Sequence, residues 1–221
     1  MFTDLIRNGL TIELVINLCV RVFTIFCVLP IHEFAHAYVA NKLGDDTARL
    51  SGRMTLNPMA HIDPMGALMM ILVGFGYAKS VPVNIGRFKS GKRKQYMALT
   101  ALAGPLSNIF MAFIFAFFYV VCDLYLPETA LTTAIILFLS FGTSINVTLA
   151  VFNLLPIPPL DGSRILSLLI PNKYYYKILQ YERYIVLVIF ALLFMGILNK
   201  PITIISALLE SLIFYIVTLP F

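Results

Sequence analysis

Long apolar stretches, separated by short polar ones, set the pattern of this chain. Five stretches are apolar over most of their length: 12–43, 96–122, 130–152, 184–198 and 202–219. A helix needs about 20 residues to cross the hydrocarbon core of a bilayer, and the first three stretches reach that length. The pattern predicts an all-α polytopic membrane protein with about five transmembrane helices, the last two joined as a hairpin at residues 199–201.

Residues 45–94, between the first two long helices, follow no helical period. The stretch 49–58 alternates loosely and contains Gly52, which favours a small β-hairpin. The apolar run 65–77 is short for a span, so we expect a re-entrant segment that is covered by protein or lines a cavity. Because neither an internal repeat nor a low-complexity linker divides the chain, residues 1–221 are expected to form a single membrane-embedded domain.

Composition supports the membrane assignment. Hydrophobic residues make up 60% of the chain and charged residues only 12%, whereas a soluble domain carries about 25% charged residues. The net charge of +5 is not interleaved with aromatic side chains, so we expect a basic edge that faces lipid headgroups rather than a nucleic-acid partner. The three cysteines lie in apolar runs without a C-x-x-C pair, which argues against a disulfide framework.

The distribution of Lys and Arg predicts the orientation, because cytoplasmic loops of membrane proteins are enriched in both. With residues 41–95 and 153–183 in the cytoplasm, these loops hold nine and four basic residues, against Arg7 and Lys200 on the other side. Arg21 lies inside the first span, where it either snorkels or faces a polar interior. We therefore expect a multi-pass protein of the cell membrane whose N-terminus is outside.

An H-E-x-x-H pattern, His32 to His36, lies inside the first apolar stretch. Positions i and i+4 share one helix face, so the two imidazoles can bind one metal ion, and Glu33 can act as general base on a water molecule. The alternative is a pair of buried histidines satisfied by hydrogen bonds. Ionisable side chains inside a membrane segment are costly and indicate function, and two of the chain's three histidines lie here. We therefore favour a metal site.

Catalytic zinc has three protein ligands and one open position. The candidates for the third ligand are Asp63, Asp161, Glu182, Glu210 and His61. Asp161 is favoured because prolines at 156, 158 and 159 exclude a regular helix before it, and Gly162 permits a sharp turn after it. Asp161 also suits a helix N-cap, and both roles are compatible. In the predicted orientation it lies at the depth of the two histidines, toward the cytoplasmic side.

Three motifs together resemble the site-2 protease family of intramembrane zinc metalloproteases. They are HEFAH at 32–36, GPLSN at 104–108 and NLLPIPPLDG at 153–162. The sequence is most similar to the compact bacterial branch, and it contains neither the PDZ nor the CBS domains of other branches.

The resemblance implies one zinc ion per chain, held by His32, His36 and Asp161, with Glu33 as general base. It also implies that Asn153 polarises the scissile carbonyl or binds the substrate backbone. The function it implies is that of an intramembrane zinc endopeptidase, which hydrolyses peptide bonds within or next to transmembrane segments of substrate proteins in regulated intramembrane proteolysis. The expected partners are those substrates and the lipid bilayer, and the sequence sets no oligomeric state.

Two other classes of protein stay open. A non-enzymatic membrane protein can bind zinc structurally or transport it, since intramembrane His and Asp also suit a transporter. A pseudo-protease can bind membrane proteins without cutting them. Glu33 argues against both, and a transporter is expected to show inverted repeats, which this sequence lacks.

A helical substrate shields its own peptide bonds, so it must unwind, and an edge strand can then hold it extended. The candidate edge is 51–57, with Ser51, Thr55 and Asn57 as candidate substrate-binding residues. Asn108 is a further candidate. Asn57 equally suits a turn, and Asn108 equally suits helix packing.

Several other polar residues allow two interpretations of their role. Thr143, Ser144, Asn146 and Asn108 either line a water path to the metal or pack helices together, and we favour packing for each of them. His61 either belongs to the substrate site or hydrogen-bonds a turn, and we favour the turn.

Overall fold

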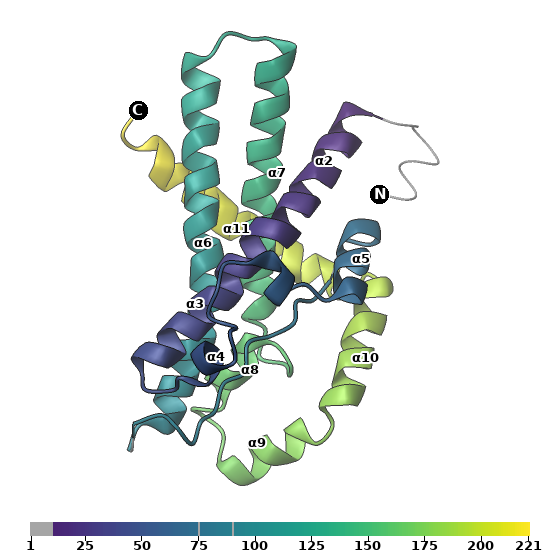
Figure 1. Ribbon diagram of the computed structural model, residues 1–221. Helices are drawn as coiled ribbons and strands as arrows, with labels where there is room; N and C mark the ends of the chain where they lie inside the picture. The colour runs from purple at the N-terminus through teal and green to yellow at the C-terminus, as the bar shows by residue number, and fades with distance from the viewer. Residues whose placement is uncertain (1–10, 75, 90) are drawn as a thin grey trace.

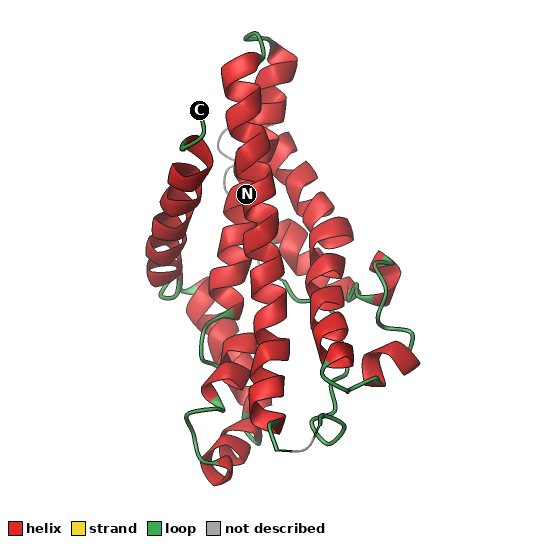
Figure 2. Cartoon of the chain, turned by 90° about the vertical axis from the view of Figure 1, so that its left-hand side faces the viewer, coloured by secondary structure: helices red, strands yellow, loops and turns green. Residues whose placement is uncertain are grey.

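The computed structural model describes residues 11–221 except 75 and 90, and these described residues are mostly helical, without a strand (Figures 1 and 2). The first helices are α2 (Ile12–Phe23), a π-helical turn (Thr24–Val28), α3 (Leu29–Lys42), α4 (Thr47–Leu50), a 3-10 turn (Pro58–Ala60) and α5 (Pro64–Leu72). The remaining helices are α6 (Arg93–Tyr125), α7 (Ala130–Asn153), α8 (Asp161–Leu166), α9 (Asn172–Leu179), α10 (Glu182–Phe194) and α11 (Asn199–Thr218).

Within the described residues, 4 helices are long and apolar enough to cross a membrane: Ile12–Lys42, Arg93–Tyr125, Ala130–Asn153 and Asn199–Thr218. The predicted polytopic, helical membrane protein is therefore confirmed. With 13 residues, α10 is short for a span of its own, so the predicted number of about five is not confirmed. Figure 1 shows no hairpin of α10 and α11: α11 continues toward the end of the molecule where the α6–α7 turn lies.

The packed centre of the bundle is the antiparallel pair α6 and α7, against which α10 and α11 lie. Its buried apolar side chains come from all four helices: Ala112, Ala116, Val120, Val147, Val151, Ile189, Leu193, Ile202, Ile213 and Val217. A Cβ atom on Gly142 would lie 2.4 Å from the Phe115 ring, so α7 can approach α6 this closely only with glycine there. Small residues at such contacts are typical of membrane helices.

The first span is one continuous helix with a local change of winding just before Pro30. Proline offers no backbone N–H and its ring clashes with the preceding turn of an α-helix. The chain accommodates this with a π-helical turn, in which the Leu29 N–H donates to the Thr24 carbonyl five residues back. The helix ends where predicted, at Gly44, whose φ of 109° suits glycine.

The predicted β-hairpin at 49–58 is wrong. The end of α4 and the start of the 3-10 turn occupy this stretch, because its short polar side chains bond neighbouring backbone groups and favour turns over a strand. The Asp45 carboxylate accepts the Thr47 N–H (3.1 Å) before α4. Gly52, with φ of 69°, follows α4, and Asn57 Oδ1 accepts the Met59 N–H (3.0 Å) at the next turn.

The apolar run predicted as re-entrant forms the short helix α5. Asp63 caps its N-terminus by accepting the N–H groups of Met65 (3.0 Å) and Gly66 (2.9 Å). At its C-terminus, Arg21 of α2 donates from Nη1 to the carbonyl oxygens of Met70 (3.0 Å) and Ile71 (3.2 Å). Arg21 therefore faces the protein interior and does not snorkel.

After α5, residues 77–84 run without regular secondary structure across α3, and we call them the crossing segment. Three of its N–H groups donate to oxygens of other segments: Lys79 to His61 O (2.8 Å), Val81 to Glu33 Oε2 (2.8 Å) and Asn84 to Asp45 Oδ2 (2.6 Å). The Val81 side chain is buried with Ala37 and Ala48. These contacts fix the crossing segment beside the HEFAH motif.

Candidate metal centre

The two histidines of HEFAH point from one face of α3 into the protein. His32 and His36 are 5% and 6% exposed, and their Nε2 atoms lie 3.0 Å apart. This closeness follows from their i, i+4 spacing on a helix. The motif therefore offers two buried ligand atoms aimed at one point.

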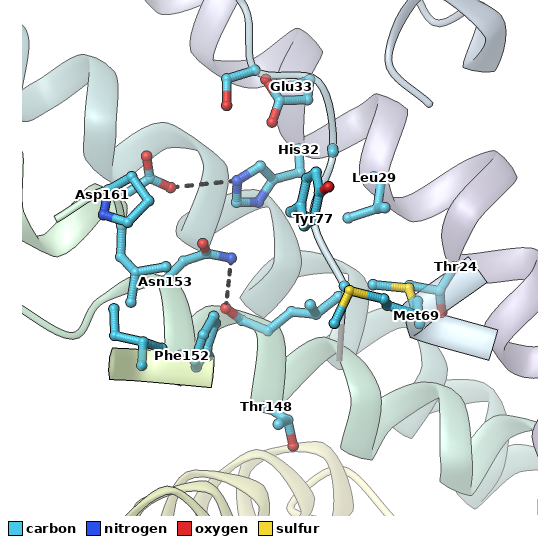
Figure 3. A pocket seen from close by; sticks show the side chains of 18 of the residues that line it. Thr24, Leu29, His32, Glu33, Met69, Tyr77, Thr148, Phe152, Asn153 and Asp161 are labelled. Atoms are coloured by element: carbon cyan, nitrogen blue, oxygen red, sulfur yellow. Dashed lines mark hydrogen bonds and ion pairs between the residues drawn. The ribbon is translucent and has the colours of Figure 1, made fainter. Parts of the chain in front are cut away.

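Asp161 is distant from these histidines in the sequence but lies beside His32 in the fold (Figure 3). Its Oδ2 atom lies 3.4 Å from His32 Nε2 and 3.2 Å from His36 Nε2. Helix α8 begins at Asp161 and its N-cap is Leu160, so the carboxylate does not serve as the N-cap. A Cβ on Gly162 would lie 2.1 Å from the Leu154 carbonyl oxygen. Glycine is thus required for the tight loop that presents Asp161.

The three ligand atoms fit zinc. Tetrahedral zinc with bonds of about 2.0–2.1 Å to nitrogen and oxygen places its ligand atoms about 3.3 Å from one another. The separations here are 3.0, 3.2 and 3.4 Å. Within the described part of the chain, this is the one group of three His, Cys, Asp or Glu side chains close enough to share an ion.

Both imidazoles are oriented through their other ring nitrogen. His36 Nδ1 lies 2.7 Å from the Thr100 carbonyl oxygen, and His32 Nδ1 lies 3.3 Å from Asn108 Oδ1. With Nδ1 directed at these oxygens of α6, each Nε2 faces the shared point, where a bound metal ion would take the place of its contact with Asp161. The orientation of both imidazoles is thus set by α6.

Gly104 of the GPLSN motif allows α6 to reach the histidines. A Cβ atom there would lie 2.3 Å from His36 Nε2 and 2.5 Å from His32 Nε2. Any side chain at this position would therefore displace the ligand atoms. Asn108, a candidate substrate-binding residue in the sequence, is buried one turn further along and contacts His32.

The charge state of Asp161 also suits a metal ligand. Burial acts to raise the pKa of this carboxyl group, but hydrogen bonds to His32 and His36 outweigh burial and hold the pKa well below its usual range. The carboxylate is therefore ionised at neutral pH.

Glu33 lies beside the ligands and is 6% exposed. Its Oε2 atom accepts the Val81 N–H of the crossing segment at 2.8 Å. Glu33 also lines the cavity that contains the ligands, so its carboxylate is both anchored and within the reaction space.

A cavity of about 740 Å³ opens over the three ligand atoms. Its walls come from α2, α3, α7, α10 and the crossing segment. Asn153, at the end of α7, lines it close to Asp161 (Figure 3) and donates from Nδ2 to the Leu149 carbonyl at 2.9 Å. The cavity thus brings the HEFAH motif and the NLLPIPPLDG motif to one space.

Comparison with known proteins agrees with the zinc chemistry that the geometry of the site indicates. A model of peptidase family M50 matches residues 121–196. YwhC, a candidate zinc metalloprotease of Bacillus subtilis (strain 168), is 44% identical over 165 residues, which cover 74% of this chain and 74% of YwhC. The chain belongs to peptidase family M50. The resemblance to the site-2 proteases is thereby confirmed, and the protein is a membrane metalloprotease.

More distant relatives of this M50 peptidase carry names of the same kind. Rip2 of Mycolicibacterium smegmatis, a candidate zinc metalloprotease, is 32% identical over 139 residues, which cover 61% of this chain and 51% of Rip2. MJ0611 of Methanocaldococcus jannaschii, also a candidate zinc metalloprotease, is 31% identical over 139 residues, 62% of this chain and 63% of that protein. No solved structure matches the chain.

Three candidate substrate-binding residues of the sequence lie away from the cavity of this M50 peptidase. Ser51 donates to the Thr47 carbonyl (2.9 Å), Thr55 Oγ1 accepts the Asn57 N–H (3.1 Å), and none of Ser51, Thr55 and Asn57 lines the cavity. His61 Nε2 donates to the Thr55 carbonyl (2.8 Å), in agreement with the turn-forming reading. A substrate-binding role for the three residues stays a prediction.

Sequence reasoning missed Thr100, Gly104 and Val81. Thr100 acts through its main-chain carbonyl, and Val81 through its main-chain N–H, so neither side chain gives a signal. Gly104 stood in a recognised motif, but only the contact between α3 and α6 shows that it faces the histidines.

Proposed function

We propose that this M50 peptidase is an intramembrane endopeptidase with one zinc ion per chain, which hydrolyses peptide bonds within or next to transmembrane segments of other proteins. The observation that carries the proposal is the meeting of His32, His36 and Asp161 beside Glu33 in one cavity. The HEFAH part of this site belongs to a candidate membrane span. A zinc ion held there would activate water at the depth of a membrane-embedded substrate.

The proposed roles divide between the metal and the protein. Bound zinc acts as a Lewis acid that makes water a nucleophile at neutral pH and polarises the scissile carbonyl. Glu33 takes a proton from the water and passes it to the leaving amine. Asn153 turns its amide from the Leu149 carbonyl, which it bonds in this structure, toward the oxygen on which negative charge develops.

The crossing segment is the element best placed to hold an extended substrate. Its residues Tyr77, Ala78, Ser80, Val81 and Val83 line the cavity. Among the described residues, no backbone partner is found for the N–H groups of Ala78 and Ser80. Added strands bind through such free main-chain groups. We therefore place the substrate along 78–83, beside Glu33, rather than along 51–57.

The proposed orientation puts the active site toward the cytoplasm of a cell-membrane protein. Helices α3 and α8, which carry the HEFAH motif and Asp161, lie toward the end of the bundle where α4 and α9 also lie (Figure 1). The segments 43–92 and 154–181, which include α4 and α9, hold nine of the 16 Lys and Arg residues, and cytoplasmic loops are rich in both. Helix α9, which lies there, adds Lys173 and Lys177 beside Tyr174, a combination typical of the membrane interface.

The first experiment compares wild type with Glu33→Gln. The variant removes the base but no zinc ligand, so we expect it to retain about one zinc per chain. Cleavage should fall by a factor of about 100 or more, the range for loss of a general base. Membrane proteomics of cells carrying either protein shows which membrane protein accumulates uncut, and metal analysis of the purified proteins gives the zinc content.

The controls separate the competing functions. Glu13→Gln, on the same span but outside the cavity lining, should cleave as wild type does. His32→Ala should lose both zinc and cleavage. Cleavage by pure Glu33→Gln at the wild-type rate contradicts the peptidase mechanism. Zinc flux into proteoliposomes that His32→Ala abolishes would instead support a transporter.

A further inference from the structure

A second cavity lies between α7 and α11 and has a volume of about 340 Å³. Six of its eight lining residues carry polar side chains. The ones that matter here are Ser144 and Thr148 on α7 and Thr203, Ser206 and Glu210 on α11. Both helices are candidate membrane spans, so this cavity is a polar space at membrane depth.

Among these side chains, Glu210 costs the most free energy to place inside a membrane span. Its side chain is half-buried and lines the cavity together with Ser144 of α7. Among the residues that the structure describes, Glu210 forms no ion pair. An acidic side chain in a membrane span normally faces a polar interior or a water-filled space. Glu210 therefore requires further polar partners, and the cavity beside it is where they fit.

Ser206 gives independent support. It is 5% exposed, and its hydroxyl group has no hydrogen-bond partner among the described residues. Leaving a buried hydroxyl without a partner costs free energy. Water occupies about 30 Å³ per molecule in the liquid and usually satisfies such groups, so a cavity of about 340 Å³ has room for several water molecules.

This polar cavity adjoins the active-site cavity. Ser144 and Thr148 line both of them. Figure 3 places Thr148 at the side of the active-site cavity away from the ligands, next to the yellow ribbon of α11. Of the described residues, only these two side chains of α7 are common to the walls of both cavities, so they mark the shortest route for water between them.

We propose that the α7–α11 cavity is a water-holding site, organised by Glu210 and Ser206, from which water reaches the reaction centre. The inference rests on the proposed hydrolytic function, because hydrolysis consumes one water molecule per peptide bond. Ser144, for which the sequence allowed either a water path or helix packing, belongs to the water path. Glu210 is a positioning residue: it holds water and does not touch the reacting atoms.

The first test measures hydration without reference to activity. Cys19, Cys27 and Cys122 are replaced by alanine, and a single cysteine is introduced by Thr203→Cys or, as the matched control, Ile204→Cys. Both side chains are exposed, but only Thr203 lines the cavity. A small charged methanethiosulfonate should modify Thr203→Cys about tenfold faster, because only the thiolate formed in water reacts. Equal rates, as expected when lipid or a partner helix fills the cavity, overturn the proposal.

The second test links the cavity to hydrolysis. Glu210→Leu should lower kcat by about tenfold, the scale of one lost buried polar interaction, with KM and zinc content unchanged. Glu210→Gln keeps hydrogen bonding and should stay within about twofold of wild type. If the Glu210→Leu protein is fully active, the α7–α11 cavity does not supply water to the reaction centre, even if Thr203→Cys is modified.

The two proposals fail in distinguishable ways. If wild type and Glu33→Gln do not differ in cleavage, the proposed function fails while thiol labelling of the cavity still stands. If wild type cleaves and Thr203→Cys reacts no faster than Ile204→Cys, only the water-holding site fails.

Discussion

At the scale of single residues, the metal centre depends on groups that bind no metal. The Thr100 carbonyl and the Asn108 amide oxygen orient the two imidazoles, and Gly104 leaves the space into which the ligand atoms project. Residues behind metal ligands commonly change metal affinity by about 10- to 100-fold. The GPLSN motif is therefore part of the site, although its side chains offer no ligand to zinc.

Gly104→Ala tests this dependence. In a helix interior this substitution normally stabilises by about 1 kcal/mol. Here the added methyl group would overlap His36 Nε2, at 2.3 Å, and His32 Nε2, at 2.5 Å. We expect zinc affinity to fall by about 10- to 100-fold, measured by competition with a chelator on the purified protein.

Leu106→Ala is the control for Gly104→Ala, because Leu106 lies in the same helix turn and is 50% exposed. It should bind zinc as wild type does. Unchanged zinc affinity in Gly104→Ala would show that α6 can move away from the histidines.

At the scale of elements, the sequence predicted those that local signals define. The HEFAH helix, its end at Gly44 and the α6–α7 pair follow from hydropathy, glycine and length. The hairpin at 49–58 failed because hydrogen bonds of the Ser51 and Asn57 side chains with nearby backbone groups outweigh a loose alternation.

The crossing segment was missed for a different reason. Its bond to Glu33 joins residues 48 positions apart, and neither partner carries a local sign of the other. Asp161 was found from its prolines and Gly162, but its approach to the histidines required the folded loop.

Helix α5 gives a test at this scale. Arg21→Met removes the guanidinium group that bonds the carbonyl oxygens of Met70 and Ile71. A hydrogen bond to a charged group contributes about 1.5–3 kcal/mol, so the opening of α5 should become at least about tenfold more frequent. Hydrogen exchange followed on peptides from 64–74 measures this opening.

Arg49→Met serves as the control for Arg21→Met. Arg49 is an exposed residue whose ion pair with Asp46 spans 3.8 Å, and exposed pairs contribute little. Its exchange pattern over α5 should match that of wild type. If Arg21→Met also leaves α5 unchanged, α5 is held by its apolar packing alone.

At the scale of the whole molecule, the fold unites two distant parts of the chain at one depth. The HEFAH helix and the Asp161 loop are brought together by the long α6–α7 pair, which carries the chain across and back (Figure 2). Because α6 contacts the histidines and α7 ends at Asn153, the pair positions both halves of the site. Charge counting alone placed these halves on one side of the membrane, but only packing brings their atoms to within 3.4 Å.

The path of α10 and α11 leads to the last prediction. A final hairpin of two spans would return residue 221 to the side of the basic loops. In Figure 1, α10 and α11 together cross the bundle once, and the chain ends toward the side of the α6–α7 turn. A cysteine placed after Phe221, like Glu128→Cys in that turn, should therefore react with an impermeant thiol reagent on intact cells. Lys89→Cys, in a basic loop, should react only after permeabilisation. Labelling of the added cysteine together with Lys89→Cys would instead restore five spans, and α10 would then cross the membrane on its own.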